Sequence, residues 1–119
     1  MFRSASIFAA CAAAALSATA PEALAADPIV GNWRTEAGST AAVAPCGGSF
    51  CITLRSGQHA GKRLGSVAPA GAGKYSGTII DPATDKSYSG SATLSGASLR
   101  MSGCVLGGLI CRSQTWSRR

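Results

Sequence analysis

Apolar and polar side chains alternate along much of the chain after residue 26, and no segment there keeps a helical period. The clearest alternation covers residues 86–95, where Tyr88, Gly90, Ala92 and Leu94 share one face and serines and Thr93 share the other. Such a pattern is typical of an antiparallel strand with one buried face. Comparable runs predict strands at residues 29–35, 40–46, 50–55, 74–81, 99–105 and 110–118, with a weaker one at 62–67.

Short turns between these runs define how the strands pair. A two-residue loop at Gly96 and Ala97 pairs Ser95 with Ser98, and a turn over residues 82–85 that begins with proline pairs residue 81 with residue 86. In both hairpins every apolar position then faces another apolar position or a glycine. The pairs implied are Leu94 with Leu99, Ala92 with Met101, Gly90 with Gly103, Ile79 with Tyr88, Gly77 with Gly90 and Tyr75 with Ala92.

Successive hairpins make an antiparallel meander of seven or eight strands. So short a chain cannot cover both faces of an open sheet, and closure into a barrel removes the exposed edges. We therefore predict an all-β fold, a small antiparallel up-and-down barrel. A sandwich of two sheets is the alternative architecture.

The first residues have the character of a secretory signal peptide. Arg3 precedes an apolar run over residues 7–16, and the small residues around Leu24 fit a cleavage site after Ala25. We expect a signal peptide at residues 1–25 and a single domain at residues 26–119, exported to the periplasm or, alternatively, secreted. Acylation of Cys11 is a second interpretation, although the apolar run before that residue is short.

Four cysteines remain after the signal peptide, and an even number in a small exported domain predicts two disulfides. A loop at Gly48 and Ser49 would pair Gly47 with Phe50 and set Cys46 opposite Cys51. A four-residue connection over residues 106–109 would set Cys104 opposite Cys111. Crossed pairing, a zinc site and a redox role are the alternatives, but the spacings are wider than in zinc knuckles and no C-x-x-C is present.

The net charge of the domain indicates which kinds of partner it is expected to bind. Without the signal peptide, ten Lys and Arg stand against four acids, which leaves a net charge of +6. Anionic partners are expected, either an acidic small molecule or an anionic envelope surface, and no nucleic-acid motif is present. A basic surface that serves only solubility is the alternative. With one histidine, His59, in a Gly- and Ala-rich loop, and with scattered acids that include turn-forming Asp81 and Asp85, we expect neither an enzyme nor a cofactor or metal.

A repeat of thirteen residues places three glycines in a row. Tyr75-Ser76-Gly77, Tyr88-Ser89-Gly90 and Met101-Ser102-Gly103 follow one another at this spacing. The register then sets Gly77, Gly90 and Gly103 side by side on the inner face, as a strip without side chains. Beside it, the last hairpin pairs Gly103 with Arg112 and Leu99 with Trp116, so Arg112, Gln114 and Trp116 point inward.

An inward arginine beside a glycine strip suggests a site for an anionic or polar-headed ligand. In the alternative interpretation the glycines serve strand curvature, and Arg112 lies at the barrel mouth or pairs with Asp81 or Glu36.

Several motifs carry a resemblance to a known family. The segments are Gly31-Asn32-Trp33, Cys46-Gly47 with Cys51, Tyr75-Ser76-Gly77 with Asp81-Pro82 and Lys86-Ser87-Tyr88, Gly103-Cys104-Val105-Leu106-Gly107-Gly108, and Cys111 through Trp116 with Arg118. Together they resemble domain-of-unknown-function family 2147 of small exported bacterial proteins. The resemblance implies a lipocalin-like barrel in the periplasm without an assigned role. The chain departs from the family pattern at Ile52, where members often carry glycine, and at Thr84-Asp85, where Asp-Gly is usual.

The first and last strands are also similar to the lipocalin closure, in which an arginine packs over a tryptophan; Trp33 and Arg118 occupy these positions. The function expected is a binding protein that holds a small apolar or anionic molecule. Arg112 and Gln114 would anchor the polar part of the ligand. Walls would come from Tyr75, Tyr88 and Trp116. The alternative is an envelope interaction module with a filled barrel, whose basic surface docks on anionic lipid or on a partner protein.

Overall fold

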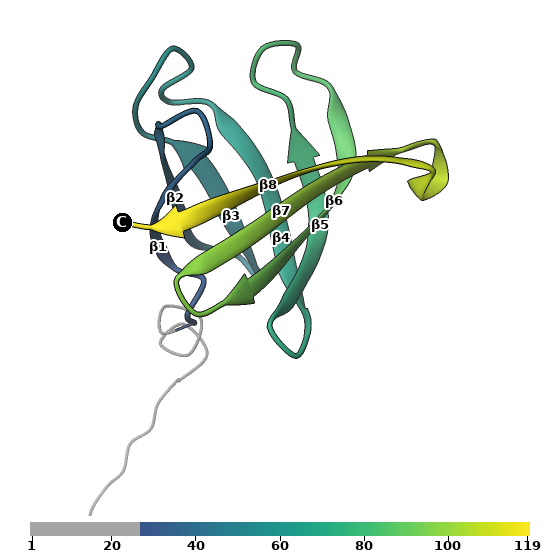
Figure 1. The fold of residues 1–119 in the computed structure, drawn as a ribbon, viewed down its shortest axis with the longest axis horizontal. Coiled ribbons are helices and arrows are strands. Elements are labelled where there is room, and N and C mark those ends of the chain that lie inside the picture. Colours follow the sequence, from purple (N-terminus) through teal and green to yellow (C-terminus); the bar gives the residue numbers. More distant parts are fainter. Residues whose placement is uncertain (1–26) are drawn as a thin grey trace, which may run out of the picture.

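The computed structural model describes residues 27–119, and they form eight strands that close into one antiparallel barrel (Figure 1). The strands are β1 (Gly31–Arg34), β2 (Thr40–Cys46), β3 (Ser49–Leu54), β4 (Arg63–Gly71), β5 (Lys74–Ile80), β6 (Ser87–Ser95), β7 (Ser98–Val105) and β8 (Ile110–Arg118), with a 3-10 turn η1 (Leu106–Gly108) before β8. Each strand pairs with the next, and β8 returns to β1. The predicted all-β barrel is confirmed and the sandwich is wrong. The predicted signal peptide lies outside the described residues.

Strand β4 is the element that the sequence pattern underestimated. The weak run over residues 62–67 becomes a nine-residue strand that continues through Pro69 to Gly71. Proline is tolerated there because the pairing with β5 shifts between Pro69 and Gly71, at a bulge where a ladder hydrogen bond is not required. The tertiary pairing with β3 and β5 therefore extends the strand beyond its local signal.

The two hairpins that join β5, β6 and β7 have the predicted register. Ser95 faces Ser98 across the Gly96-Ala97 loop, and Gly90 faces Gly103 farther along. Between β5 and β6 the ladder continues to Ile80 opposite Ser87, and Asp81 N donates to Lys86 O across the turn. These loops specify the register because each has a length and residue types that fit a tight connection.

The predicted register of the β2–β3 hairpin is wrong by two residues. The loop is Gly47-Gly48, so Cys46 faces Ser49 and Pro45 faces Phe50. Gly47 has φ +65°, a conformation that glycine adopts without a steric penalty, and it occupies the first loop position. A shift of two leaves every side chain on its predicted face, so Cys46 and Cys51 still lie on the same side of the sheet.

Both predicted disulfides are confirmed. Cys46 and Cys51 are bonded diagonally across the β2–β3 hairpin, with their Cα atoms 5.7 Å apart. Cys104 and Cys111 face each other directly, with Cα atoms 4.0 Å apart, across the predicted connection from residue 106 to 109. The crossed pairing and the thiolate zinc site are therefore both wrong for these cysteines.

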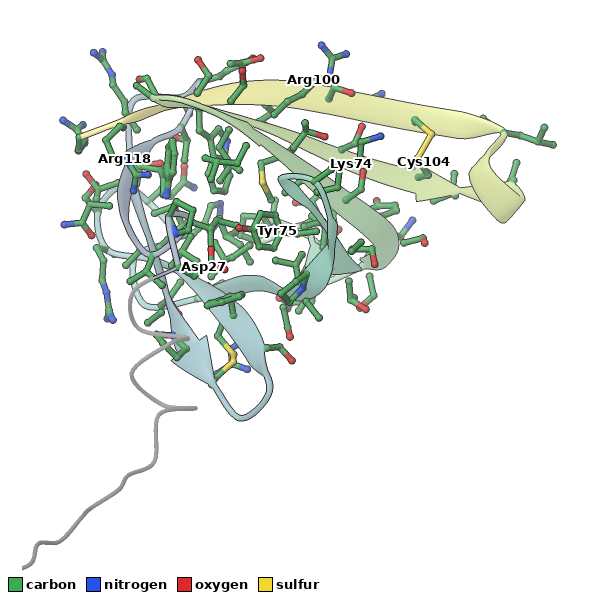
Figure 2. The ribbon with its side chains drawn as sticks, turned by 90° about the horizontal axis from the view of Figure 1, so that it is seen from below. Asp27, Lys74, Tyr75, Arg100, Cys104 and Arg118 are labelled. Carbon is green, nitrogen blue, oxygen red and sulfur yellow. A yellow bond between two sulfur atoms is a disulfide. The ribbon has the colours of Figure 1, made fainter. Side chains whose placement is uncertain are left out.

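The barrel is filled at the end where the tight turns of β2–β3, β4–β5 and β6–β7 lie. Phe50 and Tyr75 meet there edge to face, with ring centroids 6.0 Å apart. The segment before β1 closes this end: Ile29 is fully buried, and the Tyr75 hydroxyl donates to Asp27 Oδ1 at 2.6 Å (Figure 2). The core comprises Ile29, Trp33, Ala41, Val43, Phe50, Ile52, Leu54, Leu64, Val67, Tyr75, Ala92, Leu99, Met101 and Trp116.

The buried Tyr75 hydroxyl predicts a loss of stability in alkali. Burial, with the hydrogen bond and negative charge of Asp27 adding to it, raises the pKa of Tyr75 above its ordinary value of 10.0. A raised folded-state pKa means that the contribution is fully present below pH 10 and is lost as the pH rises above it. Urea unfolding at increasing pH should show a falling free energy of unfolding, and Tyr75→Phe should reduce that slope. A slope unchanged by Tyr75→Phe would contradict the assignment.

Closure between β1 and β8 is short and depends on side chains. Only Trp33 with Arg118 and Arg34 with Ser117 pair as backbone. The Arg118 guanidinium carbon lies 4.0 Å from the centroid of the Trp33 ring, as predicted, and its nitrogens donate to the carbonyls of Val30 and Pro28. Trp33 Nε1 in turn donates to Ile29 O at 3.0 Å. Arg118 and Trp33 therefore hold β8 against β1, and both also bond to the segment before β1.

Within residues 27–119, no helix has the length and apolar character needed to span a bilayer.

Candidate functional site

The opposite end of the barrel opens into a cleft of about 1040 Å³. The longer connections surround it: residues 35–39 between β1 and β2, residues 56–59 between β3 and β4, and residues 79–82 at the end of β5. Strands β7 and β8 form the remaining wall. The volume is at the upper end of the usual range for small-molecule sites, about 300–1,000 Å³.

Arg112 lines this cleft from β8. The β7–β8 register places it opposite Gly103, as predicted, so no inward side chain faces it across the hairpin. Within residues 27–119 the single ion pair is between Lys62 and Asp85, so Arg112 pairs with neither Asp81 nor Glu36. The alternative in which Arg112 forms an ion pair with either acid is wrong for the described chain. Its guanidinium N–H groups are therefore available to an anion.

Gln114 and Trp116 follow Arg112 at every second position and line the same cleft. Trp116 is 5% exposed and forms part of the floor. Its indole Nε1 donates to Gln114 Oε1 at 2.8 Å, which uses the amide oxygen of Gln114 and fixes the side chain. The amide NH₂ of Gln114 is the group that this arrangement leaves to a ligand, so Arg112 and Gln114 both contribute hydrogen-bond donors.

Apolar side chains form part of the other walls. Tyr88 and Gly103 line the cleft as predicted, and Met101 lies beside them on β7. Leu54 and Leu64, from β3 and β4, are buried and complete the floor. A surface with donors on one side and apolar groups below suits an amphipathic molecule.

Three predicted site residues lie away from the cleft. Tyr75 is buried at the filled end and is bonded to Asp27. A Cβ on Gly77 would overlap the carbonyl oxygen of Ser66, so that glycine permits close approach of β4 and β5. The space above Gly90 is occupied by the side chain of Ile79.

The glycine row is consequently no open strip. The predicted row exists in the register, but only Gly103 lines the cleft, and its neighbours serve strand packing. The prediction that the three glycines align is confirmed, but Gly77 and Gly90 do not form a ligand surface. The register alone does not reveal how closely β4 and β5 approach each other or where the Ile79 side chain lies.

Several residues at the rim were not predicted as site residues. Glu36, His59 and Asp81 come from three different connections and line the cleft. Glu36 is already engaged, because its Oε2 accepts from Thr115 N of β8 at 2.7 Å. Asp81 Oδ1 accepts from Ala83 N, as expected of a turn former, whereas Asp85 instead contacts Lys62 Nζ. These residues lie in loops of irregular sequence, and no periodicity indicated which way they would face.

No group of three or more His, Cys, Asp or Glu side chains that could hold a metal ion occurs within residues 27–119. The side chains that line the cleft can donate hydrogen bonds to an anionic or polar group and can bury the apolar part of a ligand.

Comparison with known proteins supports a family assignment. Residues 61–118, from just before β4 to the end of β8, match the model of the family described as "Uncharacterized protein conserved in bacteria (DUF2147)". The resemblance noted in the sequence is thereby confirmed over this segment. No curated protein and no solved structure gives a significant match.

Proposed function

We propose that this protein, whose residues 61–118 match the DUF2147 family, is an exported, lipocalin-like binding protein. Its ligand would be a small amphipathic molecule with an anionic or polar head. The ligand would occupy the cleft at the open end of the barrel. Arg112 and the Gln114 amide would hold its head, while Trp116, Met101 and Leu54 would contact its apolar part.

The observation that carries this proposal is Arg112 beside Gly103, without an ion pair in the described chain. Arg112 is exposed at an inward-facing position of β8, so its guanidinium is accessible to a ligand in the cleft. Here four acids are described in the domain, and the two that border the cleft, Glu36 and Asp81, accept backbone hydrogen bonds instead. An anionic head group would provide the missing partner in a partly apolar cleft, where charge-assisted hydrogen bonds are stronger than in water.

Arg112→Ala should weaken the binding of laurate at least about tenfold, since a hydrogen bond to a charged group contributes about 1.5–3 kcal/mol. Dodecanol, which has the same chain without the charge, should bind equally to both proteins. The melting temperature should change by no more than a few degrees, because Arg112 is exposed and has no ion pair within residues 27–119. Isothermal titration calorimetry with both probes measures the difference.

Arg100→Ala is the matched control, because Arg100 lies on the neighbouring strand β7 and does not line the cleft. A loss of laurate affinity equal to that of Arg112→Ala would show that general charge, not the cleft, attracts the probe. A large loss of stability in Arg112→Ala with laurate binding intact would instead support a structural role for Arg112.

Native mass spectrometry of protein purified from its own cell envelope tests the proposal without choosing a probe. A small molecule that co-purifies and is lost in Arg112→Ala supports it. A clean apo mass combined with salt-sensitive binding to vesicles favours the second candidate below.

The second candidate function is an envelope interaction module that docks on an anionic surface. The specific observation in its favour is that one end of the barrel is filled by packed side chains, while residues 27–119 carry ten Lys and Arg against four acids.

A further inference from the structure

Among the described residues, the large apolar side chains that are exposed to solvent lie at the end of the β7–β8 hairpin. Leu106 is 68% exposed, Leu109 84% and Ile110 54%, and all three lie within five positions. Figure 1 shows this hairpin reaching past the other strands, with the turn at its end. Apolar residues gathered at one protruding point, rather than scattered singly, indicate an interaction site.

This end is held rigidly in an unfavourable backbone conformation. The Cys104–Cys111 disulfide crosses the hairpin just below it (Figure 2). Leu106 has φ +56°, in the left-handed region that bulky residues rarely adopt, and it is followed by Gly107 at φ +65° and Gly108 at φ +95°. Because the Leu106 side chain is mostly exposed, core packing does not compensate for this conformation. Backbone strain of this kind occurs most often at functional positions.

Charge is distributed unevenly around the hairpin. The segment from residue 86 to 119 carries five cationic side chains and no acid, whereas all four acids of the described chain lie at or before residue 85. Between residues 101 and 111 there is no charged side chain at all. The charged side chains nearest the hairpin end are therefore cationic: Lys86 precedes Ser87, which lines a hollow beside this end, and Arg112 follows Cys111. The five cationic residues are Lys86, Arg100, Arg112, Arg118 and Arg119.

We propose that residues 106–110 form a docking tip that inserts shallowly into an anionic lipid bilayer, with the neighbouring cations Lys86 and Arg112 contacting lipid head groups. This inference rests on the second candidate function and names the segment that performs it. Apolar anchoring and attraction of Lys and Arg to anionic lipid reinforce each other in this arrangement.

Two further features favour a bilayer as the occupant. A second copy docked through the same hairpin would bring Lys86 and Arg112 of both chains together, and these like charges would repel. A hollow of about 510 Å³ beside the tip is lined by Ser87, Tyr88 and Ser89, whose hydroxyls could hydrogen-bond to a head group. An apolar tip that protrudes also enters a fluid interface without requiring a complementary groove in the partner.

The test is flotation with vesicles of phosphatidylglycerol and phosphatidylethanolamine, compared with vesicles of phosphatidylcholine, at low and high salt. The unaltered protein should bind the anionic vesicles in a salt-sensitive manner. The double variant Leu109→Asn with Ile110→Asn should bind them at least about tenfold more weakly. Both side chains are exposed, so the variant should melt near the temperature of the unaltered protein.

The matched control is Ala97→Asn, which places the same side chain in the turn at the opposite end of β7. It should bind like the unaltered protein. Leu109→Trp gives an independent reading: Trp33 and Trp116 are buried, so a blue shift in emission upon adding anionic vesicles would report on the tip.

Each outcome separates the two proposals. If the unaltered protein does not bind anionic vesicles at low salt, docking on lipid is wrong, and the tip proposal is overturned as well. If it binds and the double variant binds equally well, charge alone performs the docking and only the tip proposal is overturned. A change in oligomeric state caused by the double variant, with vesicle binding intact, would assign the tip to contact with a second copy and would also overturn it.

Discussion

Trp33→Ala is expected to cost about 3–5 kcal/mol in the free energy of unfolding, the usual range for deleting a fully buried large aromatic side chain. Trp33 is 0% exposed, and its indole Nε1 donates to Ile29 O. The variant also removes the ring over which Arg118 lies, at 4.0 Å from its centroid. Because β1 and β8 share only two backbone pairs, the barrel loses a principal side-chain contact at its closure. Urea unfolding followed by circular dichroism measures the change.

Trp33→Phe keeps the prediction testable if the alanine variant does not fold. It retains an aromatic ring beneath Arg118 but leaves the buried Ile29 carbonyl without its indole donor, so a smaller loss of about 1–3 kcal/mol is expected. Arg118→Ala should also weaken the closure through the lost contacts with Trp33 and Val30. If Trp33→Ala were as stable as the unaltered protein, the closure would depend on other contacts.

Gly77→Ala is expected to destabilise the protein strongly, whereas Gly103→Ala is not. A Cβ on Gly77 would overlap Ser66 O and lie 2.8 Å from Val67 Cα, and both atoms are backbone that no rotamer change can move. We expect a loss of about 3 kcal/mol, at the upper end of the range for overpacking. For a domain of this size that corresponds to a fall of about 10–20 °C in melting temperature.

On Gly103, the added Cβ would meet Tyr88 Cβ at 3.6 Å and Ile79 Cβ at 3.9 Å, both ordinary contacts. Because glycine inside a strand costs conformational entropy, alanine should be neutral there or stabilise by up to about 1 kcal/mol. Differential scanning calorimetry of the two variants gives the comparison. Equal effects at both positions would mean that β4 and β5 do not approach as closely as described.

The two glycines illustrate how far sequence reasoning extends. The thirteen-residue repeat and the turns at Gly96 and Pro82 were sufficient to align Gly77, Gly90 and Gly103 across three strands, and the structure has that alignment. Their roles differ because strand curvature brings β4 onto Gly77, while the Ile79 side chain folds over Gly90. Neither effect leaves a mark in the pattern of hydrophobic and polar positions.

The candidate site divides in the same way. Arg112, Gln114 and Trp116 could be predicted as one inward row because strand alternation is strict and the Cys104–Cys111 pairing fixes its phase. Glu36, His59 and Asp81 could not, since loops have no period from which to infer a direction. Tyr75 was assigned to the site on its inward face, but the segment at Asp27 fills that end of the barrel.

Most of the strands and of the register, the pairing of the cysteines and the contact of Arg118 with Trp33 can be predicted from local pattern, because each follows from alternation, turn chemistry or residue spacing; the full length of β4 cannot. The β2–β3 register is the instructive exception: Gly47 and Gly48 could open the loop in two ways that conserve every face, so the pattern could not choose between them. Which end of the barrel is filled, where the cleft lies, and that the apolar end of the last hairpin is exposed become visible in the folded barrel alone. These properties depend on distances between segments remote in the chain, which local patterns do not encode.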